Sequence, residues 1–255
     1  MCLILFAQGA HPDYPLVIAA NRDEYYQRPT AKAGFWEDHP QVLGGRDLEC
    51  MGTWLGITRT GRFAALTNFR DPRERKTDAP SRGTLVSDFL VSDREPQEYL
   101  EQVARLAPRY NGFNLLAGDI DGIYYFSSRA GAVQQVAPGI HGLSNHLLDT
   151  PWPKVVRGTQ RLQQALAHEP STDLLLDLLH DRDPAQAGEL PDTGIGSEME
   201  RVLSPALIVS PQYGTRASTA VLFGRDGAVR FSERTILRDG AAGATVSMHF
   251  NVSRA

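Results

Sequence analysis

The chain has 255 residues, with 26 Lys or Arg against 30 Asp or Glu and a formal net charge of -4. Mild acidity, without a basic stripe or a zinc-finger spacing, argues against nucleic acid as a partner. No apolar run reaches the ~18 residues of a membrane span. The N-terminus lacks the pattern of a secretory signal, and two cysteines make no disulfide framework, so we expect a reduced protein in the cytoplasm.

Strand and hairpin patterns dominate the first part of the chain. Apolar runs at Cys2–Ala7 and Leu16–Ala20 predict two strands joined by a turn-rich connector. The strands expected at Thr53–Thr58 and Arg62–Asn68 flank a three-residue loop closed by Gly61. Two further hairpins are expected, pairing 113–118 with 123–127 and 218–223 with 229–234. Hairpins with glycine-closed turns favour antiparallel sheets over βαβ winding.

Apolar residues at three- and four-residue spacing predict helices at 84–91, 96–107, 153–167 and 172–180. Pro153 suits a first helical position, and Ser171 is a candidate N-cap. The stretch 183–197, rich in Pro, Gly and Asp, predicts a loop. The whole pattern is typical of one α+β domain, residues 1–255, in which helices cover antiparallel sheets.

Cys2 follows the initiator methionine, and it is small enough for Met1 to be removed. The mature chain would then carry an amine with a pKa of ~7.7–8.0 beside a thiol with a pKa of ~8.5. An N-terminal amine can act as the base for such a thiol, which makes Cys2 a candidate nucleophile. The alternative is that Cys2 opens a buried strand and packs as a small hydrophobic residue. A Cys2–Cys50 bridge would consume the thiol.

Asn21, Arg22, Asp23 and Glu24 follow the second predicted strand. One interpretation is a surface turn. The other is that an antiparallel pairing of the first two strands brings these residues beside Cys2. A carboxylate there would hold the amine, and Arg22 would favour the thiolate.

Two asparagines and one arginine are further candidates. Asn68 ends a predicted strand, and Asn145 follows Gly142-Leu143-Ser144. Each asparagine either forms a turn through hydrogen bonds to its own backbone or donates its side-chain amide to an oxyanion. Arg216 precedes a β run, where it would bind a carboxylate, stabilise a thiolate or simply lie on the surface.

Other chemistries lack support in the sequence. There is no HExxH or Cys/His cluster for a metal, no P-loop, no GxSxG elbow and no Cys-x-x-Cys-His for covalent haem. Noncovalent binding of haem through a histidine stays open.

Eight motifs together resemble the NRDE family, which includes the homologues of transport and Golgi organisation protein 2. Behind Met1-Cys2 they are NRDE at 21–24, GTWLG at 52–56, ALTN at 65–68, YNGFNL at 110–115, GLSN at 142–145, TPWPK at 150–154, YGTR at 213–216 and FSER at 231–234. The match runs in order through nearly the whole chain.

The resemblance implies an N-terminal-nucleophile hydrolase fold, a four-layer αββα sandwich of two antiparallel sheets flanked by helices. The family is similar to the cysteine branch that holds penicillin V acylase and bile salt hydrolase. By that similarity Cys2 matches the nucleophile and Asp23 the motif carboxylate. Asn68 and Asn145 match the oxyanion-side asparagines, and Arg216 matches the distal arginine.

The chain departs from that branch at one position. The branch has an arginine immediately before the motif asparagine, whereas Ala20 stands here and the arginine is Arg22. A shift of two residues keeps the strand face and moves the Cα by about 6–7 Å.

Two functions follow from the resemblance. The first is a cysteine amidohydrolase or acyltransferase that acts on a linear amide or thioester and needs no cofactor. Phe35, Trp36 and Trp54 are candidates to line its acyl pocket, although core packing is the more common use of such residues. The second is a protein that binds and moves haem, acyl-coenzyme A or another lipid in the same cleft, without turnover.

Overall fold

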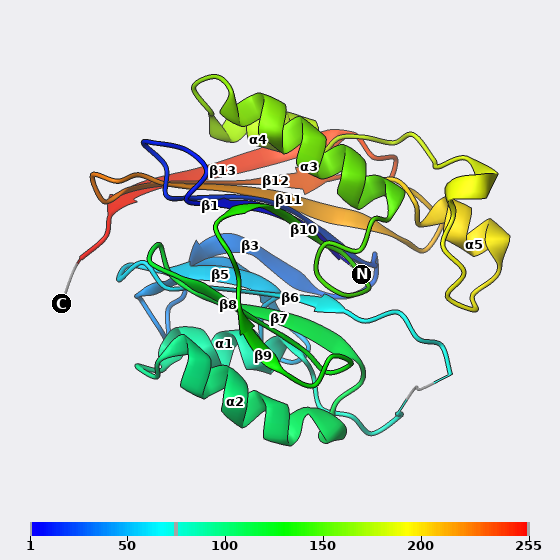
Figure 1. The fold of residues 1–255 in the computed structure, drawn as a ribbon, viewed down its shortest axis with the longest axis horizontal. Coiled ribbons are helices and arrows are strands. Elements are labelled where there is room, and N and C mark those ends of the chain that lie inside the picture. The colour runs from blue at the N-terminus through cyan, green and yellow to red at the C-terminus, as the bar shows by residue number, and fades with distance from the viewer. Residues whose placement is uncertain (1, 74–75, 254–255) are drawn as a thin grey trace.

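The computed structural model describes residues 2–73 and 76–253 (Figure 1). Two antiparallel sheets stack face to face, α3 and α4 cover the outer face of the first, and α1 and α2 cover that of the second. The four-layer α+β sandwich expected from the sequence is therefore confirmed.

Sheet A holds six strands in the order β10-β1-β2-β11-β12-β13. Their bounds are β1 Cys2–Gln8, β2 Leu16–Tyr25, β10 Gly139–Leu143, β11 Tyr213–Phe223, β12 Ala228–Ile236 and β13 Ala242–Asn251. Sheet B holds seven strands in chain order. They are β3 Thr30–Phe35, β4 Val42–Asp47, β5 Leu55–Thr58, β6 Phe63–Asn68, β7 Phe113–Gly118, β8 Ile123–Ser127 and β9 Val133–Gln135.

The helices lie between the strand groups. They are α1 Gly83–Val91, α2 Pro96–Leu106, α3 Pro153–Leu166, α4 Thr172–Leu178 and α5 Ser197–Val202, with 3₁₀ turns at Ala107–Arg109 and Ala187–Glu189. Ser171 caps α4 as predicted, because its side chain accepts a hydrogen bond from the Leu174 amide. None of the helices in the described residues is long and apolar enough to cross a membrane.

Apolar side chains form a core in each of the three spaces between layers. In β1, Ile4 and Phe6 enter the core between the two sheets, whereas Leu3 and Leu5 pack beneath α3 and α4. Both faces of the strand are therefore buried, which explains its continuous apolar run.

The predicted hairpins are confirmed, including the turn at Gly61, which has a φ of +88°. The predicted end of the second strand at Ala20 is wrong, since β2 continues through the polar residues to Tyr25. The sequence analysis also missed β3, β4, β9, β10 and β13. β13 is largely exposed, so its residues lack the apolar signal of a core strand.

The core between the sheets should dominate stability. Phe231 on β12 is 1% exposed within this core, so we expect Phe231→Ala to lower the free energy of unfolding by about 3–5 kcal/mol. Leu237 lies beyond the end of the same strand and is 48% exposed, so Leu237→Ala should change the free energy of unfolding by less than about 0.5 kcal/mol. Urea denaturation of both variants measures the difference, and equal effects would contradict this account of the core.

Candidate active site

The pairing of β1 with β2 positions the start of the site. In this antiparallel register Cys2 lies opposite Arg22, and Leu3 lies opposite Asn21. Asn21, Arg22 and Asp23 are all buried, with Asn21 and Asp23 each 1% exposed. The interpretation of the NRDE motif as a surface turn is therefore wrong, and the predicted position beside Cys2 is confirmed.

Cys2 opens onto a cavity of about 280 Å³ at the end of the sandwich where β1 begins. Its lining is mostly polar and comes from both sheets and from the connection that leads into α1. The lining residues are Cys2, Arg22, Asp23, Glu24, Arg28, Asp47, Glu49, Cys50, Thr53, Trp54, Leu66, Asn68, Ala79, Pro80, Ser81, Arg82, Gly83 and Asn111. No histidine is among these residues of the described chain.

Several effects, acting in opposite directions, set the pKa of the Cys2 thiol. Burial raises the pKa of Cys2 above its ordinary value, and the nearby Asp23 carboxylate raises it as well. A hydrogen bond from the Asp23 backbone and the charge of Arg22 lower it. Because burial is the largest of these effects, the Cys2 thiol needs a base before it can act as a nucleophile.

The Arg22 guanidinium lies over the ring of Trp54, 4.5 Å from its centroid, and 3.9 Å from a Glu24 carboxylate oxygen. The Trp54 indole has room because Gly45 faces it, where a Cβ atom would come within 2.0 Å of the ring. Arg22 and Cys2 lie opposite each other on the same face of sheet A, and both line the cavity.

Asp23 is held from the helix side of sheet A. Its Oδ1 accepts a hydrogen bond of 2.6 Å from the Thr215 hydroxyl, which in turn accepts one from the Ile208 amide. Burial raises the pKa of Asp23, while the ammonium of Lys154 opposes that shift. The carboxylate of the motif therefore depends on a buried cation that comes from α3.

Lys154 is a site residue that the sequence analysis missed. It is 3% exposed, and its Nζ donates to the Leu203 carbonyl at 3.1 Å. Burial lowers the pKa of Lys154 to about 8, although Asp23 raises it. A lysine in the first turn of an amphipathic helix looks solvent-exposed in a sequence, and the only signal for it was its place in the TPWPK motif.

The backbone of residues 203–208 connects these groups. Its carbonyls accept hydrogen bonds from Lys154 at Leu203 and from the Asn21 amide at Ala206, and its Ile208 amide donates to Thr215. Asn21 of the NRDE motif therefore has a structural role in this arrangement, because it ties β2 to the segment that also holds Lys154.

The two candidate asparagines lie next to each other, in different settings. Asn68 ends β6 and lines the cavity. Asn145 is fully buried outside the cavity lining, and its side-chain amide donates to the Asn68 carbonyl at 2.9 Å. The hydroxyl of the preceding Ser144 donates to the Cys2 carbonyl at 3.3 Å, so the turn links sheet B to β1.

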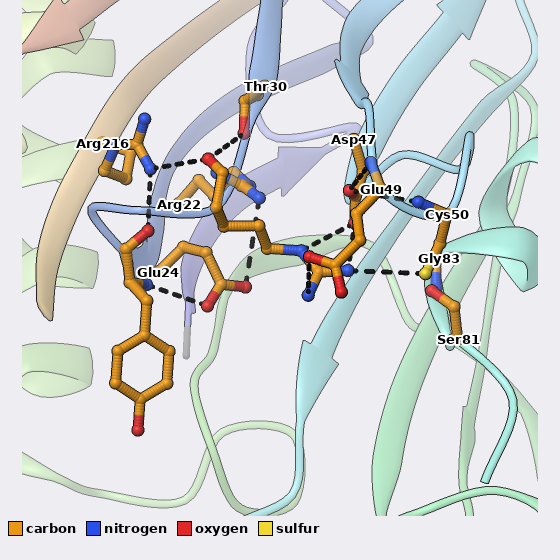
Figure 2. Close-up of polar contacts among 11 residues, drawn as sticks. Arg22, Glu24, Thr30, Asp47, Glu49, Cys50, Ser81, Gly83 and Arg216 are labelled. Atoms are coloured by element: carbon orange, nitrogen blue, oxygen red, sulfur yellow. Dashed lines mark hydrogen bonds and ion pairs between the residues drawn. The ribbon is translucent and has the colours of Figure 1, made fainter. Parts of the chain in front are cut away.

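Arg216 lies at a β-bulge of β11, opposite the NRDE segment. Its Nη1 donates to the carbonyls of Tyr25 at 2.8 Å and Arg28 at 3.2 Å (Figure 2). Arg216 is not part of the cavity lining. It instead fixes the turn after β2, from which the Arg28 side chain reaches the cavity.

A second polar network lines the cavity around Arg28. The Arg28 guanidinium binds one Asp47 oxygen through Nε and Nη2, at 2.9 and 2.6 Å, and approaches Glu49 at 3.2 Å. Cys50 lies beside it, with its sulfur 3.6 Å from an Arg28 nitrogen (Figure 2). Cys2 and Cys50 are both free thiols.

Of the three aromatic residues expected to line an acyl pocket, only Trp54 lines the cavity. Trp36 is buried outside it and donates from its indole to the Gly44 carbonyl, and Phe35 packs against Phe250. Phe35 and Trp36 therefore follow the alternative expectation of core packing, since both side chains have structural contacts away from Cys2.

The buried lysine gives a test of the site by pH. Burial lowers the pKa of Lys154 to about 8 in the folded protein, whereas an ordinary lysine has a pKa of ~10.4. Between these two pH values the Lys154 amine is more protonated in the unfolded chain than in the folded protein. Lys154 therefore makes stability rise with pH between these values, by at most about 1.4 kcal/mol per pH unit. Lys154→Met should lack this rise in urea denaturation at pH 7.5, 8.5 and 9.5, whereas Lys32→Met, at an exposed position, should retain it. A constant difference between wild type and Lys154→Met would contradict the assignment.

A family model described as Transport and Golgi organisation 2 matches residues 1–238. The chain is 38% identical over 259 residues to the Transport and Golgi organization 2 homolog of Mus musculus, and 41% identical over 262 residues to the Transport and Golgi organization protein 2 homolog of Bos taurus. Each alignment covers 93% of this chain and 94% of the relative.

Among solved structures, the fold is similar to the Caenorhabditis elegans N-acylethanolamine-hydrolyzing acid amidase (NAAA) ortholog. The TM-score is 0.50 at 10% sequence identity, and the alignment covers 87% of this chain and 92% of that chain. This likeness concerns the fold alone. The family model and the relatives confirm the resemblance drawn from the motifs, and the chain belongs to the Transport and Golgi organisation 2 family.

Proposed function

We propose that the cavity at Cys2 is the active site of a cysteine N-terminal-nucleophile amidohydrolase or acyltransferase, acting on a linear amide or thioester. The observation that carries the proposal is the pairing of Cys2 with Arg22 at the mouth of a polar cavity that Asp23 and Asn68 also line. The fold likeness to an amidase ortholog is consistent with that chemistry.

In the proposed reaction, Met1 is removed and the new amine of Cys2 takes the proton of its own thiol. The thiolate attacks the acyl carbon, and the resulting oxyanion accepts hydrogen bonds, for which Asn68 offers a side-chain amide in the cavity lining. The amine then returns the proton to the leaving amine or thiol as the carbon–nitrogen or carbon–sulfur bond breaks. Water or an acceptor releases the acyl group from the Cys2 thioester.

The surrounding residues have positioning roles in this scheme. Asp23, held by Thr215, is suited to hold the ammonium form of the Cys2 amine. Asn145 fixes the backbone of Asn68, and Arg216 fixes the turn that carries Arg28. Burial raises the pKa of the Cys2 thiol, so its attack on a carbonyl requires a base. No histidine of the described residues lines the cavity, which is consistent with the Cys2 amine in that role.

The second candidate function is binding without turnover, with haem or an acyl-coenzyme A as cargo. The raised pKa of the Cys2 thiol favours this function for a chain that retains Met1, because burial disfavours the thiolate and such a chain lacks the Cys2 α-amine as its base. Cys2 and Cys50 are the sulfur ligands that this cavity lining would offer to haem iron, and an absorbance titration of wild type and of each cysteine variant tests that binding.

The nucleophile is tested by a panel of acyl amides and thioesters with wild type and Cys2→Ala. We expect the variant to lose turnover and to lose the mass increase produced by an electrophilic acyl probe, with peptide mapping to separate Cys2 from Cys50. Intact mass of the untreated protein reports whether Met1 is removed. Full activity in Cys2→Ala, or turnover by a chain that retains Met1, would refute the mechanism.

A further inference from the structure

The cavity at Cys2 is lined by three arginines whose charges are compensated to different degrees. Arg28 is paired with both Asp47 and Glu49. Arg22 lies 3.9 Å from Glu24 and stacks on an indole ring. Arg82 also lines the cavity but makes no ion pair with any of the residues 2–73 and 76–253, and the acidic side chain whose charge acts on it, Glu24, lies beyond ion-pair distance.

Arg82 is held in place without being neutralised. It is the residue before α1, half-buried, and its Nη1 donates to the Gly112 carbonyl at 2.9 Å. Burial lowers the pKa of Arg82, while Glu24 and Cys2 act in the opposite direction from across the cavity. One hydrogen bond uses one of the five donors of a guanidinium, which leaves donors for a ligand.

Two further features of the lining favour an anion near Arg82. Gly83, the first residue of the nine-residue helix α1, lines the cavity; its amide donates to the Ser81 hydroxyl at 3.3 Å, and the N-cap residue Arg82 makes no side-chain cap. The helix dipole places partial positive charge at this end of α1. Opposite, Nη1 of Arg22 is buried without a hydrogen-bond acceptor in the described part of the chain, a condition that buried donors rarely keep.

The carboxylates of the cavity do not offer a matching site for a cation, because each already has a donor. Asp47 and Glu49 share Arg28, and Asp23 accepts from Thr215. Glu24 accepts from the Tyr25 amide and lies near Arg22. The group in need of a partner is thus an arginine, which matches an oxyanion in charge and in planar geometry.

The size of the cavity limits the ligand. At about 280 Å³ the cavity lies just below the range of ~300–1,000 Å³ of typical ligand pockets. Since most of its lining is charged or polar, the enclosed part of a substrate is short and polar.

We infer that Arg82 is the recognition residue for a carboxylate or comparable oxyanion on a small acyl amide or thioester whose carbonyl lies at Cys2. This inference rests on the proposed function for the reacting carbonyl. The binding of the anion to Arg82 does not require turnover, so the two can be tested apart.

The test measures binding to the Cys2→Ala protein, by titration calorimetry or ligand-observed NMR. The probes are N-acetylglycine, with its charge on the amine side, succinamic acid, with its charge on the acyl side, and the neutral N-acetylglycinamide. We expect at least one acid to bind about tenfold or more tightly than the neutral amide, and the stronger acid to report which side of the amide bond carries the charge.

Arg82→Gln in the same background should remove the preference for the acid, and Arg82→Lys should keep part of it. Arg105→Gln, at an exposed position of α2 outside the cavity lining, should leave it unchanged. Equal binding of acids and neutral amide, or an unchanged preference in a folded Arg82→Gln protein, would overturn the inference. An Arg82-dependent preference in a protein that hydrolyses none of the amide panel would retain the anion site and refute the hydrolase proposal instead.

Discussion

The register between β1 and β2 is the constraint on which the site depends. It places Cys2 opposite Arg22 and, two residues further in, Ile4 opposite Ala20 in the core between the sheets. A slip of one residue would turn both sets of side chains to the other face, so the apolar pattern of the strands also fixes the chemistry at their end. The hydrophobic core and the position of the thiol are consequences of the same pairing.

Burial of Asn21 and Asp23 in the polar motif is possible because each has a hydrogen-bond partner from a distant segment. Asn21 bonds to the backbone after α5, and Asp23 bonds to β11. Removing one member of such a network leaves buried polar atoms unsatisfied, which costs ~1–3 kcal/mol for each neutral group. The arrangement thus holds the side chains around Cys2 in fixed orientations, as a preorganised site requires.

The sequence was most informative where the signal was local. Glycine-closed hairpins and the apolar runs at both ends of the chain predicted antiparallel sheets, and strand adjacency predicted Arg22 beside Cys2. It failed where tertiary contacts override local character. The end of β2 was placed too early because polar residues seldom continue a core strand. Arg82 gave no sign that it lines the cavity, and Lys154 gave no sign of its burial beyond its place in the TPWPK motif. Their roles depend on contacts with Leu203 and Gly112, which no spacing in the chain reveals.

The hydrogen bond between Thr215 and Asp23 also bears on how the protein folds. The two residues are separated by 192 positions, and the strands that carry them are neighbours in the middle of sheet A. Contacts of such sequence separation form late, because the entropy of closing the intervening chain is lost before the pairing stabilises it. During synthesis Cys2 therefore emerges long before Thr215, so the Asp23 carboxylate is anchored only after most of the chain has been made.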